Sequence, residues 1–352
     1  MKILLTTVQG LEDLVLQEIF SLLAVNEILS YRTLEYKGRI YLDVRDEKIT
    51  DFLRELMFKS RLIDHVYLII LEKRLDNISQ INNFVQEFFV KHLKDFLNQY
   101  TFYAVSSQRL EKRWEITSVQ LSKNIGEIID NLNVFLSPIS LDDPDLVVYA
   151  ELKRDSICLG FNLTFNTPLH RRSYRRYIHP SMINPILASA LCYLSKIEKR
   201  RKILDPFCGS GTILIECKKI NPECICYGYD INPKHVNGAK QNIIEAGVDD
   251  IHVGVSDILE LDKKLDNIDA IITNPPFGIR EEAIGGINRV YKYLFDLSVK
   301  ILNENGVLTI ITPRSNIIRR LIKKYNKYFR LLNLRRIYEG GLEANIYVLE
   351  RK

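Results

Sequence analysis

The segment Asn274-Pro275-Pro276-Phe277 combines residue types that could hold an aromatic amine. It follows an apolar run at 269–273 that reads as a buried strand, and two prolines in succession end any strand ladder. The Asn274 side-chain oxygen and the Pro275 carbonyl can accept the N–H groups of an exocyclic amine, and so stabilise the positive charge that develops when that nitrogen attacks. Phe277 offers a flat face on which a base drawn out of its helix could stack. The alternative is a strand-ending turn with Phe277 in the core.

Acidic residues stand at the ends of three successive predicted strands. Asp205 ends the first and is followed by the glycine turn at 209–211, and Asp230 and Asp257 follow the next two. Ligands of open α/β sheets bind at the carboxyl ends of strands, and an acidic residue after the second strand can accept both ribose hydroxyls. Each Asp could instead cap the following helix. Three in succession beside a glycine turn favour a nucleoside ligand, although the turn matches neither a Walker loop nor a complete dinucleotide motif.

Two kinds of element pattern position these residues. From residue 201 onward, apolar strands alternate with helical stretches, which predicts a doubly wound parallel sheet, and 331–351 reads as an antiparallel edge hairpin about Gly340-Gly341. Before residue 170, strands and amphipathic helices mix without glycine loops, which is typical of α+β domains. The connector at 166–180 carries prolines and a dense basic cluster.

The composition is that of an ordinary globular protein. The chain has 352 residues, enough for two or three domains, and a net charge of +5, which permits nucleic-acid binding without arguing for it. No apolar run is long enough to span a bilayer and the start does not read as a signal peptide, so we expect a cytoplasmic protein. The six Cys lack the spacing of a zinc site and are expected to be buried thiols, and no metal is predicted.

From about residue 178, the chain resembles the class I S-adenosylmethionine-dependent methyltransferases. The stretch "DPFCGSGT" is similar to their methionine-binding loop, and Asn-Pro-Pro-Phe to the motif of enzymes that methylate exocyclic amines. The resemblance implies an α/β Rossmann-like methyltransferase domain at 181–352, with a seven-stranded, mostly parallel sheet. It implies S-adenosylmethionine as cofactor, with Asn274, Pro275 and Phe277 as catalytic residues. The implied cofactor contacts are Pro180, Asn184, Asp205, Phe207, Gly209, Ser210, Gly211, Thr212, Asp230, Ile231, Asp257, Ile258 and Asn274.

The first half resembles the THUMP RNA-binding module with a ferredoxin-like partner. The resemblance implies a ferredoxin-like domain at 1–60, a THUMP domain at 61–165 and a basic linker at 166–180, in which Ser173 replaces the usual glycine. Arginines interleaved with tyrosines suit a bent or single-stranded RNA backbone, although a solvated linker is the alternative. The expected RNA-binding residues are Arg171, Arg172, Arg175, Arg176 and Arg280.

Together these resemblances imply a monomeric tRNA guanine-N2 methyltransferase whose target is guanine 6 of the acceptor stem. Related enzymes that act on guanine 10 usually carry Asp where Asn274 stands. A guanine-10 methyl- or dimethyltransferase and a ribosomal RNA guanine-N2 enzyme remain open. A rival of a different class is an RNA-binding protein that no longer catalyses, and the intact set of Asp205, Asp230, Asp257 and Asn274 argues against it. A DNA adenine methyltransferase would share the motif but should lack the basic α+β half.

Overall fold

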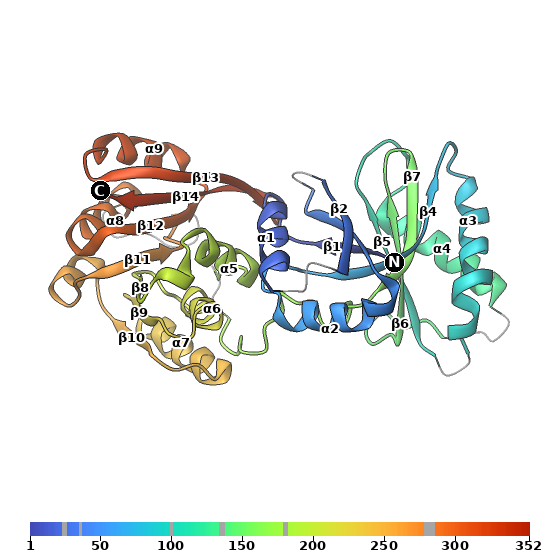
Figure 1. The fold of residues 1–352 in the computed structure, drawn as a ribbon, viewed down its shortest axis with the longest axis horizontal. Coiled ribbons are helices and arrows are strands. Elements are labelled where there is room, and N and C mark those ends of the chain that lie inside the picture. The colour runs from blue at the N-terminus through green and yellow to red at the C-terminus, as the bar shows by residue number, and fades with distance from the viewer. Residues whose placement is uncertain (23–26, 35–36, 99–100, 134–137, 179–181, 278–285) are drawn as a thin grey trace. The chain divides into compact units, whose positions relative to one another are not determined.

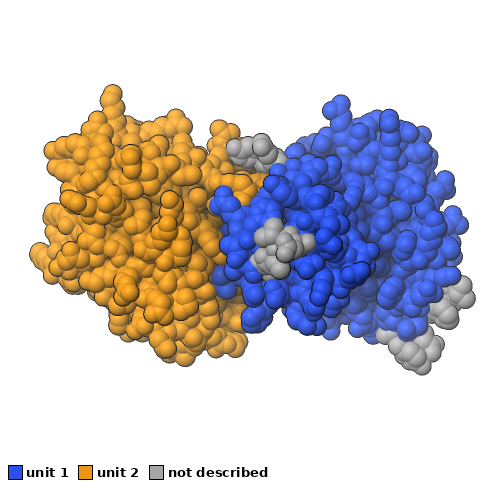
Figure 2. All heavy atoms as spheres, in the orientation of Figure 1, with its two compact units in different colours: residues 1–7, 15–169 blue, residues 8–14, 170–352 orange. Residues whose placement is uncertain are grey.

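The computed structural model describes residues 1–22, 27–34, 37–98, 101–133, 138–178, 182–277 and 286–352. The chain forms two compact units, one of residues 1–7 and 15–169 and the other of residues 8–14 and 170–352 (Figure 2). Within the described residues, each unit contains one seven-stranded sheet. The division after Leu169 falls inside the predicted linker.

The sheet of the first unit has the strand order β2-β3-β1-β4-β7-β6-β5 (Figure 1). Its pairings are antiparallel except for that between β5 and β6. Its strands are β1 Lys2–Thr6, β2 Ile28–Leu34, β3 Arg39–Val44, β4 Val66–Arg74, β5 Tyr103–Arg109, β6 Leu146–Leu152 and β7 Ser156–Asn162. The helices are α1 Glu12–Leu22, α2 Ile49–Lys59, α3 Gln80–Phe88 and α4 Ser118–Leu132, with the short turns η2 Asp46–Lys48, η3 Phe89–Leu93 and η4 Lys94–Phe96.

The helices α3 and α4 bury their apolar stripes against one face of this sheet. Val85 of α3 and Ile125 of α4 are fully buried in the same cluster as Val148 of β6. Helix α4 begins at a capping box, in which the Thr117 side chain accepts from the Gln120 amide and the Gln120 side chain accepts in return. The amphipathic pattern of the sequence therefore predicted these helices correctly.

A buried polar network ties the two ends of the sheet together. Arg39 of β3 donates from Nε to Oε2 of Glu151 on β6 at 2.8 Å, and Tyr41 also donates to Glu151. Glu151 is fully buried, so the Arg39 charge compensates a carboxylate that would otherwise be costly to desolvate. The predicted domain boundary at residues 60 and 61 lies between α2 and β4, inside this continuous sheet.

The sheet of the second unit has the order β10-β9-β8-β11-β12-β14-β13. The strands from β10 to β12 pair in parallel, whereas β14 pairs antiparallel with both β12 and β13. The predicted mostly parallel sheet and edge hairpin are therefore confirmed. The strands are β8 Lys202–Asp205, β9 Ile225–Asp230, β10 Ile251–Val255, β11 Ile268–Thr273, β12 Leu302–Thr312, β13 Phe329–Glu339 and β14 Leu342–Arg351.

Helices cover both faces of this sheet (Figure 1). The helices α5 Pro185–Leu194, α6 Thr212–Ile220 and α7 Pro233–Ala246 form one layer, and α8 Ile287–Ile301 and α9 Ser315–Lys324 form the other. The short turns are η5 Ile197–Lys199 and η6 Ile258–Lys263. Tyr291, Phe295 and Leu308 are fully buried under the second layer. In the described part of the chain, no helix has the length and apolar character that a bilayer crossing requires.

Candidate active site

The carboxyl ends of β8, β9, β11 and β12 meet at one edge of the second sheet. These strands are parallel, with Asp205 opposite Gly228 and Thr273 opposite Ile310. Asp205, Asp230 and Thr273 are the last residues of their strands, and Asn274 follows directly. The edge predicted from strand-end residues, the rim, is therefore formed.

Asp205 lies beneath the rim. Its side chain is buried, and Oδ1 accepts from Thr273 Oγ1 at 2.7 Å and from the Phe207 amide at 3.1 Å. Burial raises the pKa of Asp205 to about 7, against the smaller opposing effect of these hydrogen bonds. Asp205 is 1% exposed, so its side chain does not line the surface of the rim, and its predicted contact with the cofactor stays a prediction. Asp205 joins the end of β8 to the strand that carries Asn274.

The glycine turn adopts backbone conformations that require glycine. Gly209 has φ of 49° and Gly211 has φ of 79°, both in the left-handed region. A Cβ on Gly211 would also lie 3.3 Å from the Ala239 Cβ of α7. Between them Ser210 is buried, and its hydroxyl lies 3.2 Å from that of the equally buried Thr212. The turn therefore offers backbone to a ligand, whereas the hydroxyls of Ser210 and Thr212 face inward.

Asp230 organises the rim beside this turn. Its Oδ2 accepts from the Gly209 amide at 3.1 Å and its Oδ1 accepts from the Asn232 amide at 2.8 Å. His235 Nδ1 lies 3.3 Å from Oδ1. Each carboxylate oxygen has two acceptor positions, so Oδ2, which binds one amide here, keeps capacity for a ribose hydroxyl. Capping and ligand binding are thus compatible at this residue.

Asp257 begins the short η6 turn. Its Oδ1 accepts from the Leu259 amide at 2.9 Å, as the capping interpretation expected. The apolar residues that follow the two aspartates differ in exposure. Ile231 is 57% exposed and Ile258 is half-buried against the core, so both can contribute apolar surface to a planar ligand.

The Asn-Pro-Pro-Phe segment presents an unsatisfied amide at the rim. Asn274 is half-buried, and its side chain makes no hydrogen bond to the described residues. Pro275 is buried, and Phe277 is half-buried rather than enclosed in the core. The Phe277 carbonyl accepts from Nε of Arg314 at 2.9 Å. Sequence reasoning missed Arg314, although its place shortly after the end of β12, at the rim, was a usable signal.

The basic linker is partly a structural strap. The Tyr174 hydroxyl donates to Oε1 of the fully buried Glu216 at 2.7 Å, and Arg172 Nε lies 3.4 Å from the same oxygen. Ser189 Oγ donates to the other Glu216 oxygen at 2.7 Å. The Arg172 side chain is 11% exposed and is paired with Glu216, and its predicted RNA contact stays a prediction.

The remaining linker arginines differ in exposure. Arg171 is exposed, Arg175 is half-buried, and Arg176 is exposed with Nη2 2.7 Å from Oε1 of Glu245. Their predicted RNA contacts stay predictions. Pro180 and Arg280, which were assigned to the cofactor and to RNA, lie outside the described residues.

Asn242 of α7 connects this strap to the glycine turn. Its Oδ1 accepts from the Tyr177 amide at 2.8 Å, while Nδ2 donates to the carbonyls of Tyr177 and Ser210, each at 3.0 Å. The side chain is fully buried. We identify Asn242 as a positioning residue that the sequence reading missed, and the signal was an amide on the inner face of a helix.

Asn184 has a structural assignment. Its Oδ1 caps α5 by accepting from the Ile186 amide at 2.9 Å, and its Nδ2 donates to Oε1 of Glu339 at 2.5 Å. Both ends of the amide therefore have protein partners, and the predicted cofactor contact by this side chain finds no support. Phe207 is half-buried against the core of the unit, directly after the Asp205 strand end.

The cysteines are buried free thiols, as predicted. Four of them gather around α6, with Cys192 Sγ 3.0 Å from Cys217 Sγ and Cys224 Sγ 3.6 Å from Cys226 Sγ. Burial and the neighbouring thiol raise the pKa of Cys217. In the described ranges, no group of three or more His, Cys, Asp or Glu side chains is arranged to hold a metal ion.

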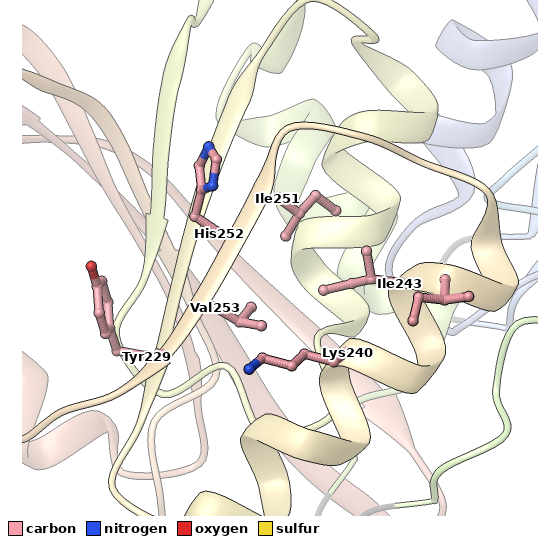
Figure 3. Close-up of a pocket in the computed structure, with 8 residues that line it drawn as sticks. Tyr229, Lys240, Ile243, Ile251, His252 and Val253 are labelled. Carbon is pink, nitrogen blue, oxygen red and sulfur yellow. The ribbon is translucent and has the colours of Figure 1, made fainter.

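A pocket of about 450 Å³ lies elsewhere in the second unit, between α7 and the edge strand β10 (Figure 3). Its lining residues are Tyr229, Lys240, Ile243, Ile244, Ile251, His252, Val253 and Gly254. None of the predicted site residues lines it. Ile251 begins β10 and Ile243 and Ile244 lie near the end of α7, so most of the pocket lies away from the rim.

Comparisons with known proteins agree with a methyltransferase. Residues 172–344 match the family described as RMKL-like, methyltransferase domain, and residues 25–241 match a DNA methylase family. The chain is 26% identical to a tRNA (guanine(6)-N2)-methyltransferase of Methanocaldococcus jannaschii, over 90% of this chain and 92% of the relative. It is 27% identical to the tRNA (guanine(10)-N2)-dimethyltransferase of that organism, over 94% and 95%.

The fold is also that of a solved structure, TrmN from Thermus thermophilus. The two chains superpose with a TM-score of 0.84 at 24% identity, over 100% of this chain and 99% of the other. The likeness covers both compact units. This superposition shows that the two chains share a fold, and it assigns no role to individual site residues.

The rim fits S-adenosylmethionine, the methyl donor of this enzyme. The left-handed glycines leave backbone accessible where a Cβ would crowd Ala239, and Asp230 has free acceptor positions beside them. Bound there, the cofactor would supply an electrophilic methyl group, and Asp230 would hold its ribose. From the matches to both families and the geometry of this rim, we conclude that the chain belongs to the methyltransferases and that its residues 172–344 are similar to the RMKL-like methyltransferase domain.

Proposed function

We propose that this enzyme methylates the exocyclic N2 amine of a guanine in tRNA, with guanine 6 as the target. The observation that carries the proposal is the half-buried Asn274 amide without a protein partner at the rim. The half-buried amide keeps its oxygen and its N–H groups available, so this side chain is suited to bind a ligand that reaches the rim. The names of the two relatives, both tRNA guanine-N2 enzymes, support the same base and the same atom.

The chemistry follows from what the chain itself offers. The lone pair of an exocyclic amine is delocalised into its ring, so the amine is a poor nucleophile. The Asn274 oxygen and the Pro275 carbonyl accept its N–H groups, which favours a pyramidal nitrogen and stabilises the positive charge that develops. Phe277 stacks on the base. Asn274 is not a useful general base, so the proton leaves to water after methyl transfer.

The first unit supplies RNA binding in this proposal. Residues 1–60 act as a ferredoxin-like domain and 61–165 as a THUMP domain, which share one sheet in this chain. Arg171 and Arg176 are exposed and would contribute positive charge to which RNA phosphates can bind. Most affinity would come from phosphate contacts, so tRNA binding would weaken with salt.

A second candidate target is guanine 10, because the similarity to the guanine-10 dimethyltransferase is nearly as extensive. Asn274, where guanine-10 enzymes usually carry Asp, favours guanine 6. The deciding experiment treats unmodified tRNA transcripts with the pure protein and S-adenosylmethionine, and maps the product by mass spectrometry. N2-methylguanosine at position 6 supports the proposal. The same product at position 10 replaces the target, and no methylated guanine refutes the function.

A further inference from the structure

Arg314 lies at the rim next to the proposed base-binding segment. It lies two residues after the end of β12, and β12 is the parallel neighbour of β11, which leads into Asn274. Its Nε donates to the Phe277 carbonyl at 2.9 Å. The backbone of Arg314 is also fixed, because its amide donates to Thr312 Oγ1 at 3.0 Å, and that hydroxyl lies 2.7 Å from the Tyr291 hydroxyl. One hydrogen bond therefore holds the guanidinium beside Phe277, and another fixes the backbone from which the side chain extends.

The guanidinium has donors that the described protein does not use. A guanidinium carries five N–H donors, and one of them, on Nε, binds Phe277. Arg314 is half-buried, and it forms no ion pair with any described Asp or Glu. By contrast, Arg39 and Arg335 are paired with Glu151 and Asp13, respectively. A half-buried cation without a carboxylate partner is suited to acceptors supplied by a ligand.

The acceptor groups of Asn274 and Pro275 alone do not distinguish guanine from adenine. Both bases carry an exocyclic amine, which acceptor groups can bind. The bases differ at position 6, where guanine has a carbonyl acceptor and adenine has an amine donor. Arginine donors pair with guanine O6 and N7 and have no equivalent partner at the adenine amine. A donor beside Phe277 would therefore select guanine.

We propose that Arg314 determines guanine specificity by donating to O6 of the base that stacks on Phe277. This inference rests on the proposed function, because it concerns the same base at the same rim. The competing role for Arg314 is purely positional: it would hold the Phe277 carbonyl, and thereby the ring, without contacting the base. The two roles differ in a measurable way, since positioning affects every base that stacks on Phe277.

The experiment compares two tRNAs that differ at one base. One carries guanine at the mapped target and the other 2-aminopurine, which keeps the N2 amine but lacks O6. We measure kcat/KM for both with wild type, Arg314→Ala and Arg314→Lys. Wild type should prefer guanine by at least about tenfold, as expected for a hydrogen bond to a charged donor. In Arg314→Ala this ratio should fall by roughly tenfold, with an intermediate ratio for Arg314→Lys.

The control is Arg319→Ala, which removes the same charge from an exposed position on α9 and should leave the ratio unchanged. Affinity for S-adenosylmethionine, measured by calorimetry, reports folding of each variant, and Arg314→Lys serves if Arg314→Ala does not fold. Equal losses on both substrates would overturn the inference and leave Arg314 a positioning residue. Absence of guanine methylation by wild type would instead refute the proposed function.

Discussion

The replacement of Asp205 by Asn should remove a specific part of the dependence of stability on pH. Burial raises the pKa of Asp205 from its ordinary value of 3.8 to about 7. The unfolded chain releases this proton near pH 4, whereas the folded chain retains it until about pH 7. The native state is therefore favoured by this group at low pH, and that contribution is lost as the pH rises through about 7.

The size of the effect follows from the pKa difference. At 1.36 kcal/mol for each pKa unit, the rise from 3.8 to about 7 corresponds to a loss of about 4 kcal/mol across the whole range. Between pH 5 and pH 8 the expected loss is roughly 2–3 kcal/mol. Asparagine keeps the oxygen that accepts from Thr273 and Phe207 but does not titrate. The variant should therefore lack this component and retain the junction between β8 and β11.

Urea unfolding at pH 5, 6, 7 and 8, followed by circular dichroism, gives the free energy of unfolding of wild type and variant. Between pH 5 and pH 8, the free energy of unfolding of wild type should fall by roughly 2–3 kcal/mol more than that of Asp205→Asn. Asp249→Asn, which alters an exposed carboxylate, is the control and should parallel wild type. Parallel pH profiles for wild type and Asp205→Asn would refute the assignment of a protonated, buried Asp205. We also expect the variant to bind S-adenosylmethionine, because the carboxylate does not reach the surface.

Three further substitutions test the rim. Asp230→Ala removes charge-assisted hydrogen bonds of roughly 1.5–3 kcal/mol each and releases the Gly209 amide, so calorimetry should show at least about tenfold weaker S-adenosylmethionine binding; unchanged affinity removes Asp230 from the site. Asn274→Ala should lower kcat by roughly 10²-fold with little effect on cofactor or tRNA binding. A wild-type rate would refute the hypothesis that Asn274 accepts a hydrogen bond from the reacting amine. Asn242→Ala breaks the bonds to Tyr177 and Ser210 and should weaken cofactor binding several-fold, whereas Asn237→Ala, exposed on the same helix, should not; equal affinities would confine Asn242 to stability.

The rim was predictable because it depends on local pattern. Strand ends can be read from apolar runs that stop at polar or glycine residues, and parallel strands bring those ends together. Asp230 and Asn274 were placed correctly at the rim for this reason. Asp205 was placed at the right strand end, but its burial was not predicted, because the depth of a side chain depends on the neighbouring strands and on the loop above it.

The polar residues inside the helical layers could not be predicted in the same way. Glu216 and Asn242 lie on inner faces of α6 and α7, and their partners come from the linker. The pairing depends on which helices face the strap, which no local pattern specifies. The linker was therefore read as a basic RNA-binding stretch. In the structure, Tyr174 and Arg172 face Glu216, while Arg171 and Arg176 remain exposed.

The two groups beside Phe277 have opposite hydrogen-bonding character, and this bears on which base they suit. Asn274 and Pro275 provide acceptor oxygens, whereas Arg314 provides donors. Guanine presents the complementary order, with donors at N2 and an acceptor at O6. Adenine oriented with its amine toward Asn274 has no exocyclic acceptor with which to meet Arg314, and it would leave the guanidinium partly desolvated and without compensation. The desolvation penalty of a donor left without a partner is larger than the net stabilisation from a typical hydrogen bond. The rim would therefore reject adenine chiefly through that penalty.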